Sequence, residues 1–205
     1  LEAHEFRFDM VWSNYRTVND QFIQKNADEW SSFENFSYNY YKGLNFKLDW
    51  KFNATLPEVT EYTNPTSGME ISTSLSRNYD KFLDEFGIYQ DFGTLKEIFN
   101  NNYYWKIKQE GKWHHKFPLV NSLAGNFRWK LGWISKPDLD SFFNFFAGGM
   151  PGLRGYPYFS MEGRNLFSLH YTFRYPIFKQ RNYKLGWFNL QNCFIGTFIE
   201  TGNAW

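Results

Sequence analysis

The sequence is poor in the residues that most soluble domains use to build a core. It holds one cysteine, six alanines and four valines among 205 residues. One cysteine excludes an intramolecular disulfide and a cysteine-rich zinc site. Basic and acidic residues nearly cancel, 22 against 21, so the positive excess of a nucleic-acid-binding domain is missing. No run of about 18 apolar residues occurs, which excludes a transmembrane helix but leaves membrane strands open, because their residues alternate.

The abundant residues are aromatic. Phe, Tyr and Trp make up 23% of the chain, although the mean hydropathy is −0.60. Aromatic residues favour strands over helices, and this much aromatic surface excludes a disordered chain. A soluble core of this size uses more Val, Leu, Ile and Ala. The composition therefore predicts an all-β protein with aromatic side chains on one side of its strands.

Alternation of apolar and polar residues occurs in seven segments. In the clearest, Leu44, Phe46 and Leu48 alternate with polar residues. The segments cover residues 5–12, 44–53, 69–76, 103–112, 122–133, 167–177 and 184–200. Most of the regular stretches are roughly 9–13 residues long, near the ~9–11 residues with which a tilted strand crosses a membrane and above the usual ~5–6 of soluble strands.

The connections between these segments alternate in length. Long connections are expected at 14–38, 80–102 and 135–164, short ones at 117–121 and 179–183, and an intermediate one at 54–67. Outer-membrane barrels have long extracellular loops and short periplasmic turns, so the three long connections are predicted to lie outside the cell. A soluble antiparallel sheet also alternates, but strand length, loop asymmetry and aromatic content favour the membrane barrel.

Seven strands cannot close a bacterial barrel of this kind. Single-chain bacterial barrels have an even number of strands, and an open edge in lipid leaves backbone groups unpaired. Residues 1–205 are therefore expected to form an arc of a larger antiparallel transmembrane barrel, with one long loop at 135–164.

That loop contains a glycine-rich motif. Residues 142–163 read FFNFFAGGMPGLRGYPYFSMEG, in which Gly148, Gly149 and Gly155 leave the backbone free to take positive φ and Arg154 precedes Tyr156 by two positions. The Lys-Ser/Thr pair of a phosphate loop and the strand-to-helix context of a dinucleotide site are both missing. Taken alone, Arg154 could simply decorate a surface loop.

Three ordered stretches resemble the Omp85 superfamily, the bacterial surface antigens that include the outer-membrane barrel-assembly insertase. The GG-x-x-x-LRGY pattern resembles the family's inward-folded loop, RNLFSLHYTFRYPIF (164–178) the strand after it, and GTFIETGNAW (196–205) the next strand. The matching strand residues are Phe173, Arg174, Pro176, Phe198, Glu200, Gly202 and Trp205. The resemblance covers residues 142–205.

The resemblance implies a function and a contact. It implies a barrel of about 16 strands in a Gram-negative outer membrane, which inserts or translocates other proteins and works with unfolded substrates and accessory subunits, without a cofactor or catalytic residues. Its loop would lie in the lumen, with Arg154 paired to Glu200. Removing one partner would cost ~3–5 kcal/mol if the pair were buried. The family often has a second acid where this chain has Thr172. A transport channel, or an anchor for an exported soluble domain, are the alternatives.

Other candidate residues carry weaker predictions. His114 and His115 should face opposite sides of one strand, and His4 and His170 look isolated. Cys193 is expected to be a small packed residue. The predicted lumen wall is basic, which fits either a solvated surface or a surface that attracts anionic segments. Its basic residues are Lys47, Lys51, Lys106, Lys108, Lys112, Arg128, Lys130 and Arg174.

Overall fold

The computed structural model is an all-β protein, with 81% of its described residues in strands. It describes residues 3–26, 29–55, 66–88, 95–118, 120–149, 153–178 and 181–205, with the backbone alone for 19–26, 29–36, 120, 121 and 185. The helical structure within these ranges is one 3-10 turn, η1, at Ser141–Phe143. None of the described residues form a helix long and apolar enough to cross a membrane.

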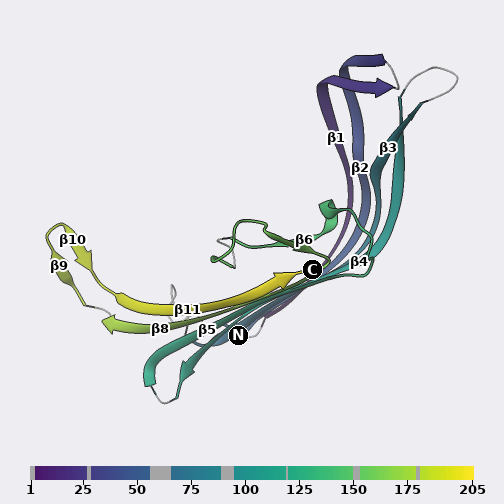
Figure 1. Cartoon of the computed structure of the whole chain (residues 1–205). Helices are drawn as coiled ribbons and strands as arrows, with labels where there is room; N and C mark the ends of the chain where they lie inside the picture. The colour runs from purple at the N-terminus through teal and green to yellow at the C-terminus, as the bar shows by residue number, and fades with distance from the viewer. Residues whose placement is uncertain are drawn as a thin grey trace. The chain divides into compact units, whose positions relative to one another are not determined.

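Seven strands form one antiparallel sheet in the order β1-β2-β3-β4-β5-β8-β11 (Figure 1). They are β1 (Ala3–Asn26), β2 (Glu29–Asn53), β3 (Gly68–Ile88), β4 (Leu95–Phe117), β5 (Val120–Ile134), β8 (Asn165–Phe178) and β11 (Cys193–Ala204). Two small hairpins pair β6 (Phe145–Ala147) with β7 (Met161–Gly163) and β9 (Tyr183–Leu185) with β10 (Phe188–Leu190). The predicted number of main strands is confirmed.

Two of the predicted long loops are wrong. Most of 14–38 and 80–102 continues β1, β2, β3 and β4, which are 24, 25, 21 and 23 residues long. In these stretches polar and apolar residues do not keep to alternate positions, so the sequence lacks the one-sided alternation that marks a strand. Neighbouring strands still pair through backbone hydrogen bonds, and rings pack across them, such as Tyr38 edge-on to Phe86 with centroids 5.0 Å apart.

The predicted turn at 179–183 and strand at 184–200 are also wrong. The described part of the connection holds the β9–β10 hairpin, and β11 begins only at Cys193. Gly186, with φ of 60°, sits in the hairpin turn, where a left-handed residue suits two tightly paired strands. The short connection after Phe117 and the long one between Ile134 and Asn165 agree with the prediction.

The chain comprises two compact units. The first contains Leu1–Arg7, Leu48–Leu75 and Lys106–Trp205, and the second contains Phe8–Lys47 and Ser76–Trp105. In the first unit, strand register separates two faces, because residues directly opposite each other on adjacent strands share a face. One row of opposed residues is Lys112, Arg128, His170 and Glu200. The neighbouring row on the other side is Trp113, Phe127, Tyr171 and Ile199.

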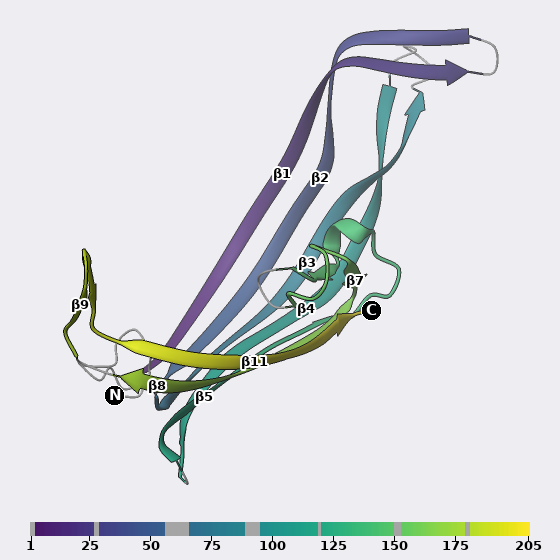
Figure 2. The ribbon, with the colours of Figure 1, turned by 60° about the vertical axis from the view of Figure 1, so that its left-hand side comes forward.

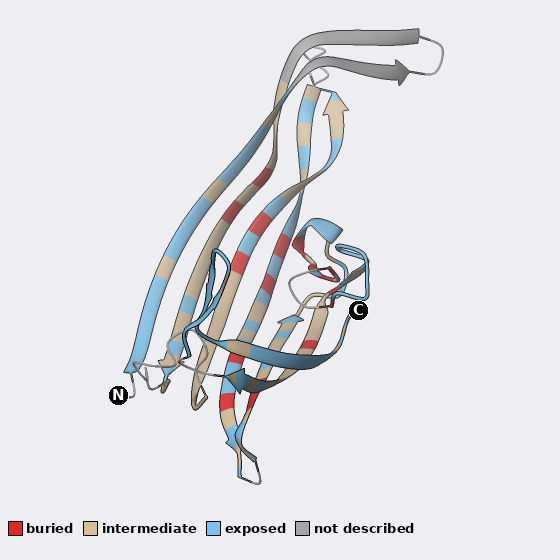
Figure 3. Ribbon diagram, turned by 90° about the vertical axis from the view of Figure 1, so that its left-hand side faces the viewer, coloured by how far each residue is buried: buried red, intermediate tan, exposed pale blue. Residues whose placement is uncertain are grey.

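We call these sides the charged face and the aromatic face of the first unit. Two further rows extend the charged face, Glu110–Lys130–Ser168–Gly202 and His114–Asn126–Thr172–Phe198. His114 bonds Asn126 on this face, whereas His115 bonds the Tyr171 hydroxyl on the other, as their adjacency predicts. Much of β11 is exposed in Figure 3, and large apolar side chains stay exposed on the aromatic face. They include Trp113, Leu131, Trp133, Tyr175, Ile195 and Ile199.

The second unit has a buried polar centre. Asp80 is 1% exposed, and its two carboxylate oxygens accept hydrogen bonds from the hydroxyls of Tyr41 (2.9 Å) and Tyr104 (2.7 Å). These residues lie on β3, β2 and β4, so one carboxylate joins three neighbouring strands. Hydrogen bonds from hydroxyls to a carboxylate are stronger than those between neutral groups. The two bonds therefore offset the cost of removing the Asp80 carboxylate from water.

Candidate functional site

The loop between β5 and β8 packs on the charged face. Figure 1 and Figure 2 both show it against one side of the sheet, beside β11. Lys106 Nζ donates to the Phe143 carbonyl and lies 4.7 Å from the centre of the Phe145 ring. The same ring covers Gly132, where a Cβ would come within 2.7 Å of it. Any larger residue at Gly132 would therefore force the Phe145 ring to shift.

A small apolar cluster fixes the base of the loop. Ala147 and Leu153 of the loop pack with Ala204 of β11, and Met161 and Leu166 lie against them. At this end of β11 the charged face carries small apolar residues instead of charged ones, and the loop covers them from water. At about 25 cal/mol per Å² of apolar area removed from water, such a cluster stabilises the docked loop.

A tight turn presents Arg154 beyond this cluster. Gly148 and Gly149 have φ of 111° and 87°, and a Cβ on Gly148 would lie 2.3 Å from the Pro157 carbonyl oxygen. The Gly149 N–H donates to the carbonyls of Leu153 and Tyr156, both at 3.1 Å. The motif glycines at these two positions are thus required by the backbone.

The turn brings Arg154 and Glu200 together. The Arg154 main-chain N–H donates to Glu200 Oε2 at 3.0 Å, and Arg154 Nε lies 3.5 Å from Oε1. The guanidinium also lies over the Phe198 ring, 4.3 Å from its centre. The Glu200 side chain is 8% exposed and that of Arg154 is 43% exposed. The carboxylate is therefore the buried centre of the contact, and the guanidinium is its partly solvated partner.

His170 belongs to the site, although the sequence shows it as isolated. Its Nδ1 lies 2.6 Å from Glu200 Oε1, its Nε2 lies 2.6 Å from the Thr172 hydroxyl, and its side chain is 7% exposed. The imidazole stacks on Phe198 with the planes 9° apart. His170 and Arg154 Nε thus share one oxygen of Glu200, Oε1, in a chain that has Thr172 where the resemblance suggests a second acid.

Thr172, His170 and Glu200 run in the order hydroxyl, imidazole, carboxylate. The same order occurs where a hydroxyl nucleophile, a base and an orienting acid cooperate. Here the carboxylate is also bound by the main chain and side chain of Arg154, and the imidazole is nearly covered. We therefore interpret the trio as a brace for the loop.

The remaining motif residues are spread over both faces. Phe173 lies on the aromatic face opposite Gly125, while Arg174 lies on the charged face opposite Gly196. Phe198 also lies on the charged face, so the expectation that aromatic side chains all point away from the charges is wrong there, because Arg154 and His170 stack on it. The others are Gly155, Tyr156, Pro176, Gly202 and Trp205.

Those other motif residues have varied surroundings. Tyr156 and Trp205 are 56% and 57% exposed, and Trp205 packs edge-on against Phe167. Gly202 faces Leu153, whose side chain would lie 3.0 Å from a Cβ there, but Gly155 has open space around it. Cys193 is partly exposed at the start of β11.

Within the described ranges, no group of three or more His, Cys, Asp or Glu side chains could hold a metal ion. The chain matches no protein-family model, no curated protein and no solved structure. Its function is therefore inferred from its own residues and geometry.

Proposed function

We propose that the chain is part of an Omp85-like outer-membrane β-barrel that inserts or translocates other proteins. The observation that carries this proposal is the loop between Ile134 and Asn165, packed on the charged face with Arg154 at Glu200. A loop that folds back into a barrel lumen packs on the wall in this way and can cover a carboxylate of a wall strand with its own Arg.

The two faces support a membrane setting. The aromatic face exposes Trp113, Trp133 and Ile199 without a protein layer over them among the described residues. Exposed apolar patches of this kind need lipid or a partner to cover them. The strands β5, β8 and β11 have 15, 14 and 12 residues, enough for tilted strands to cross the hydrocarbon.

In this proposal the loop braces the barrel wall while unfolded outer-membrane proteins are inserted elsewhere on it. A free strand edge can template an incoming strand through main-chain hydrogen bonds, and such pairing needs a wall that keeps its shape. Glu200 ties the loop to β11, and His170 ties Glu200 to β8. Accessory subunits and outer-membrane lipid are the expected partners.

The test is a folding assay with the full-length protein in liposomes. We expect it to accelerate insertion of an unfolded outer-membrane barrel, measured by protease protection, and expect Glu200→Ala to reduce the acceleration. Glu162→Ala is the control, because Glu162 is an exposed carboxylate of the loop that Glu200 binds, and it bonds to Asn144 instead. Ion conductance without any acceleration of insertion would indicate a channel. If the protein showed neither conductance nor acceleration, the anchor for an exported domain would be the remaining alternative.

A further inference from the structure

A cavity of about 550 Å³ lies on the charged face beside the tip of the loop. It is lined by residues of β4, β5, β8 and β11 and by Arg154, all within the first unit. Its cationic lining residues are Lys112, Arg128, Arg154 and Arg174, with His114 and His170 beside them. Among the described residues no carboxylate lines this cavity.

Strand register explains why the cations gather there. Arg128 lies directly opposite Lys112 on one side and opposite His170 on the other. Like charges in opposed positions destabilise a sheet. One row away, Glu110 lies opposite Lys130 and pairs with it at 3.8 Å, so the neighbouring row is balanced. The Lys112–Arg128 row is therefore a local departure from the charge pairing of this face.

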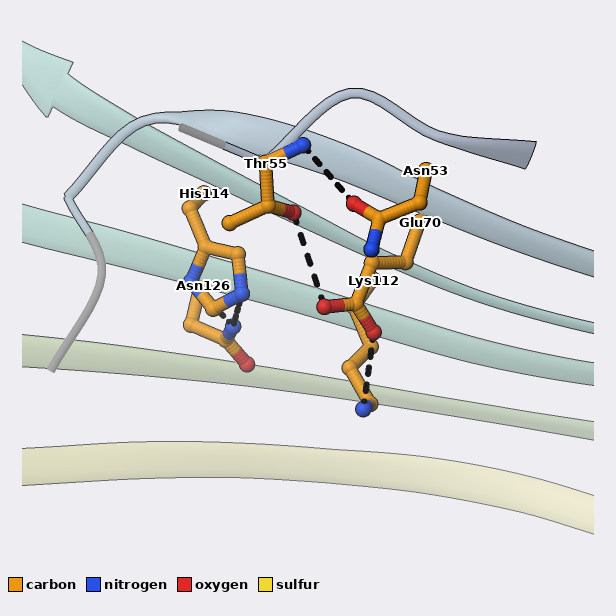
Figure 4. A network of polar contacts seen from close by, with 6 residues as sticks. All are labelled: Asn53, Thr55, Glu70, Lys112, His114 and Asn126. Carbon is orange, nitrogen blue, oxygen red and sulfur yellow. Dashed lines mark hydrogen bonds and ion pairs between the residues drawn. The ribbon is translucent and has the colours of Figure 1, made fainter. Parts of the chain in front are cut away.

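Two carboxylates already bind cations of the cavity lining. Glu70 binds Lys112 Nζ at 3.1 Å and shares a longer contact with Thr55, as Figure 4 shows. Glu200 is bound to Arg154 and His170 and is 8% exposed. Arg128 makes no ion pair with any described residue. After Glu70 and Glu200 are assigned to their partners, the positive charge of Arg128 remains without an ion pair among the described residues at the cavity.

Further polar groups complete the lining. His114 and Asn126 hold each other at 2.8 Å, also seen in Figure 4, and Thr172 bonds His170. Opposite Arg174 lie Ala124 and Gly196, two small residues that leave room for a guanidinium or its ligand. Guanidinium groups bind phosphate oxygens bidentately, and several from different strands suit a tetrahedral anion better than a planar carboxylate.

We propose that this cavity binds a phosphate group, carried by a lipid headgroup or by a small soluble phosphate compound. Arg128 is the central ligand, with Arg154 and Arg174 contacting the anion from the loop and from β8. The anion removes the repulsion along the Lys112–Arg128 row and lies next to the brace that holds the loop. The proposal stands apart from the insertion function, since it needs only the fold of the first unit.

The first arm of the test titrates inorganic phosphate into the full-length protein in detergent, in chloride buffer, by calorimetry. The second arm uses vesicles of phosphatidylcholine with or without phosphatidic acid. We expect Arg128→Gln to weaken phosphate binding about 10- to 100-fold. Lys130→Gln should change it less than about twofold, because Lys130 lies on the same face and strand but outside the cavity lining.

Saturable binding in both arms, reduced by Arg128→Gln, supports a general phosphate site, and binding in the phosphatidic acid arm alone supports a headgroup site. Equal affinity of wild-type protein and both variants in each arm overturns the proposal. Binding of an acidic peptide that Arg128→Gln weakens, but with which phosphate does not compete, also overturns the proposal. Arg174→Gln is a second variant, and heat-modifiable migration on gels verifies that each variant is folded.

Discussion

Glu200→Ala is expected to detach the loop from the sheet and to cost about 3 kcal/mol of stability. Three contacts end on this carboxylate, from the Arg154 N–H, Arg154 Nε and His170 Nδ1. Bonds to a charged acceptor contribute about 1.5–3 kcal/mol each, and bonds that share an acceptor do not add fully. Urea unfolding in lipid vesicles measures the loss, and faster proteolysis within 135–164 measures release of the loop.

Arg154→Ala is expected to cost only about 1 kcal/mol, less than a fully buried pair would. The sequence predicts ~3–5 kcal/mol for loss of a buried partner, but the Arg154 side chain is 43% exposed. The main-chain bond from residue 154 to Glu200 also survives the substitution. Equal losses for the Glu200, Arg154 and Glu162 alanine variants would contradict the view that Glu200 is the centre of the contact.

Asp80→Ala is expected to be the most destabilising change in the second unit, by about 3–5 kcal/mol. The substitution removes two charge-assisted bonds and takes this acceptor from the buried hydroxyls of Tyr41 and Tyr104. Hydrogen exchange of the β3 and β4 amides, together with urea unfolding, measures the loss. Asp80→Asn should cost less, because the amide oxygen still accepts one bond.

Asp84→Ala is the matched control for Asp80. Asp84 lies on the same strand with its side chain on the same side, four residues on, and is exposed. Exposed substitutions usually change stability by no more than about 0.5 kcal/mol. If Asp80→Ala and Asp84→Ala shifted the unfolding midpoint equally, the polar centre would not hold the three strands together.

The strands β4, β5 and β8 of the first unit could be predicted because each of their positions faces either water or an apolar environment. Where one face is charged and the other apolar, alternation fixes which side chains share a face, as in Arg128 beside Trp129. In the second unit much of the sequence does not alternate, although backbone pairing continues. The strands there run past every predicted end.

Within the site, Arg154 and Glu200 could be found from motif order alone, but His170 could not. Its place beside Glu200 depends on the register of β8 against β11, with Glu200 opposite His170. The connection between β8 and β11 contains the β9–β10 hairpin, and the pairing shifts register between Cys193 and Phe194. Both features affect which residues lie opposite each other. Neither the hairpin nor the register shift produces a repeating pattern of apolar and polar residues, so neither could be predicted from the sequence.

The most direct test of a membrane sheet with one lipid face and one wet face is cysteine accessibility. In a Cys193→Ser background, cysteines are placed at Leu131 and Trp113 on the aromatic face and at Lys130 and Lys112 on the charged face. In liposomes of the full-length protein, we predict that a water-soluble maleimide labels the Lys130 and Lys112 positions. Spin labels at the other two positions should respond to oxygen dissolved in lipid. Equal labelling of all four positions by the maleimide would contradict the account.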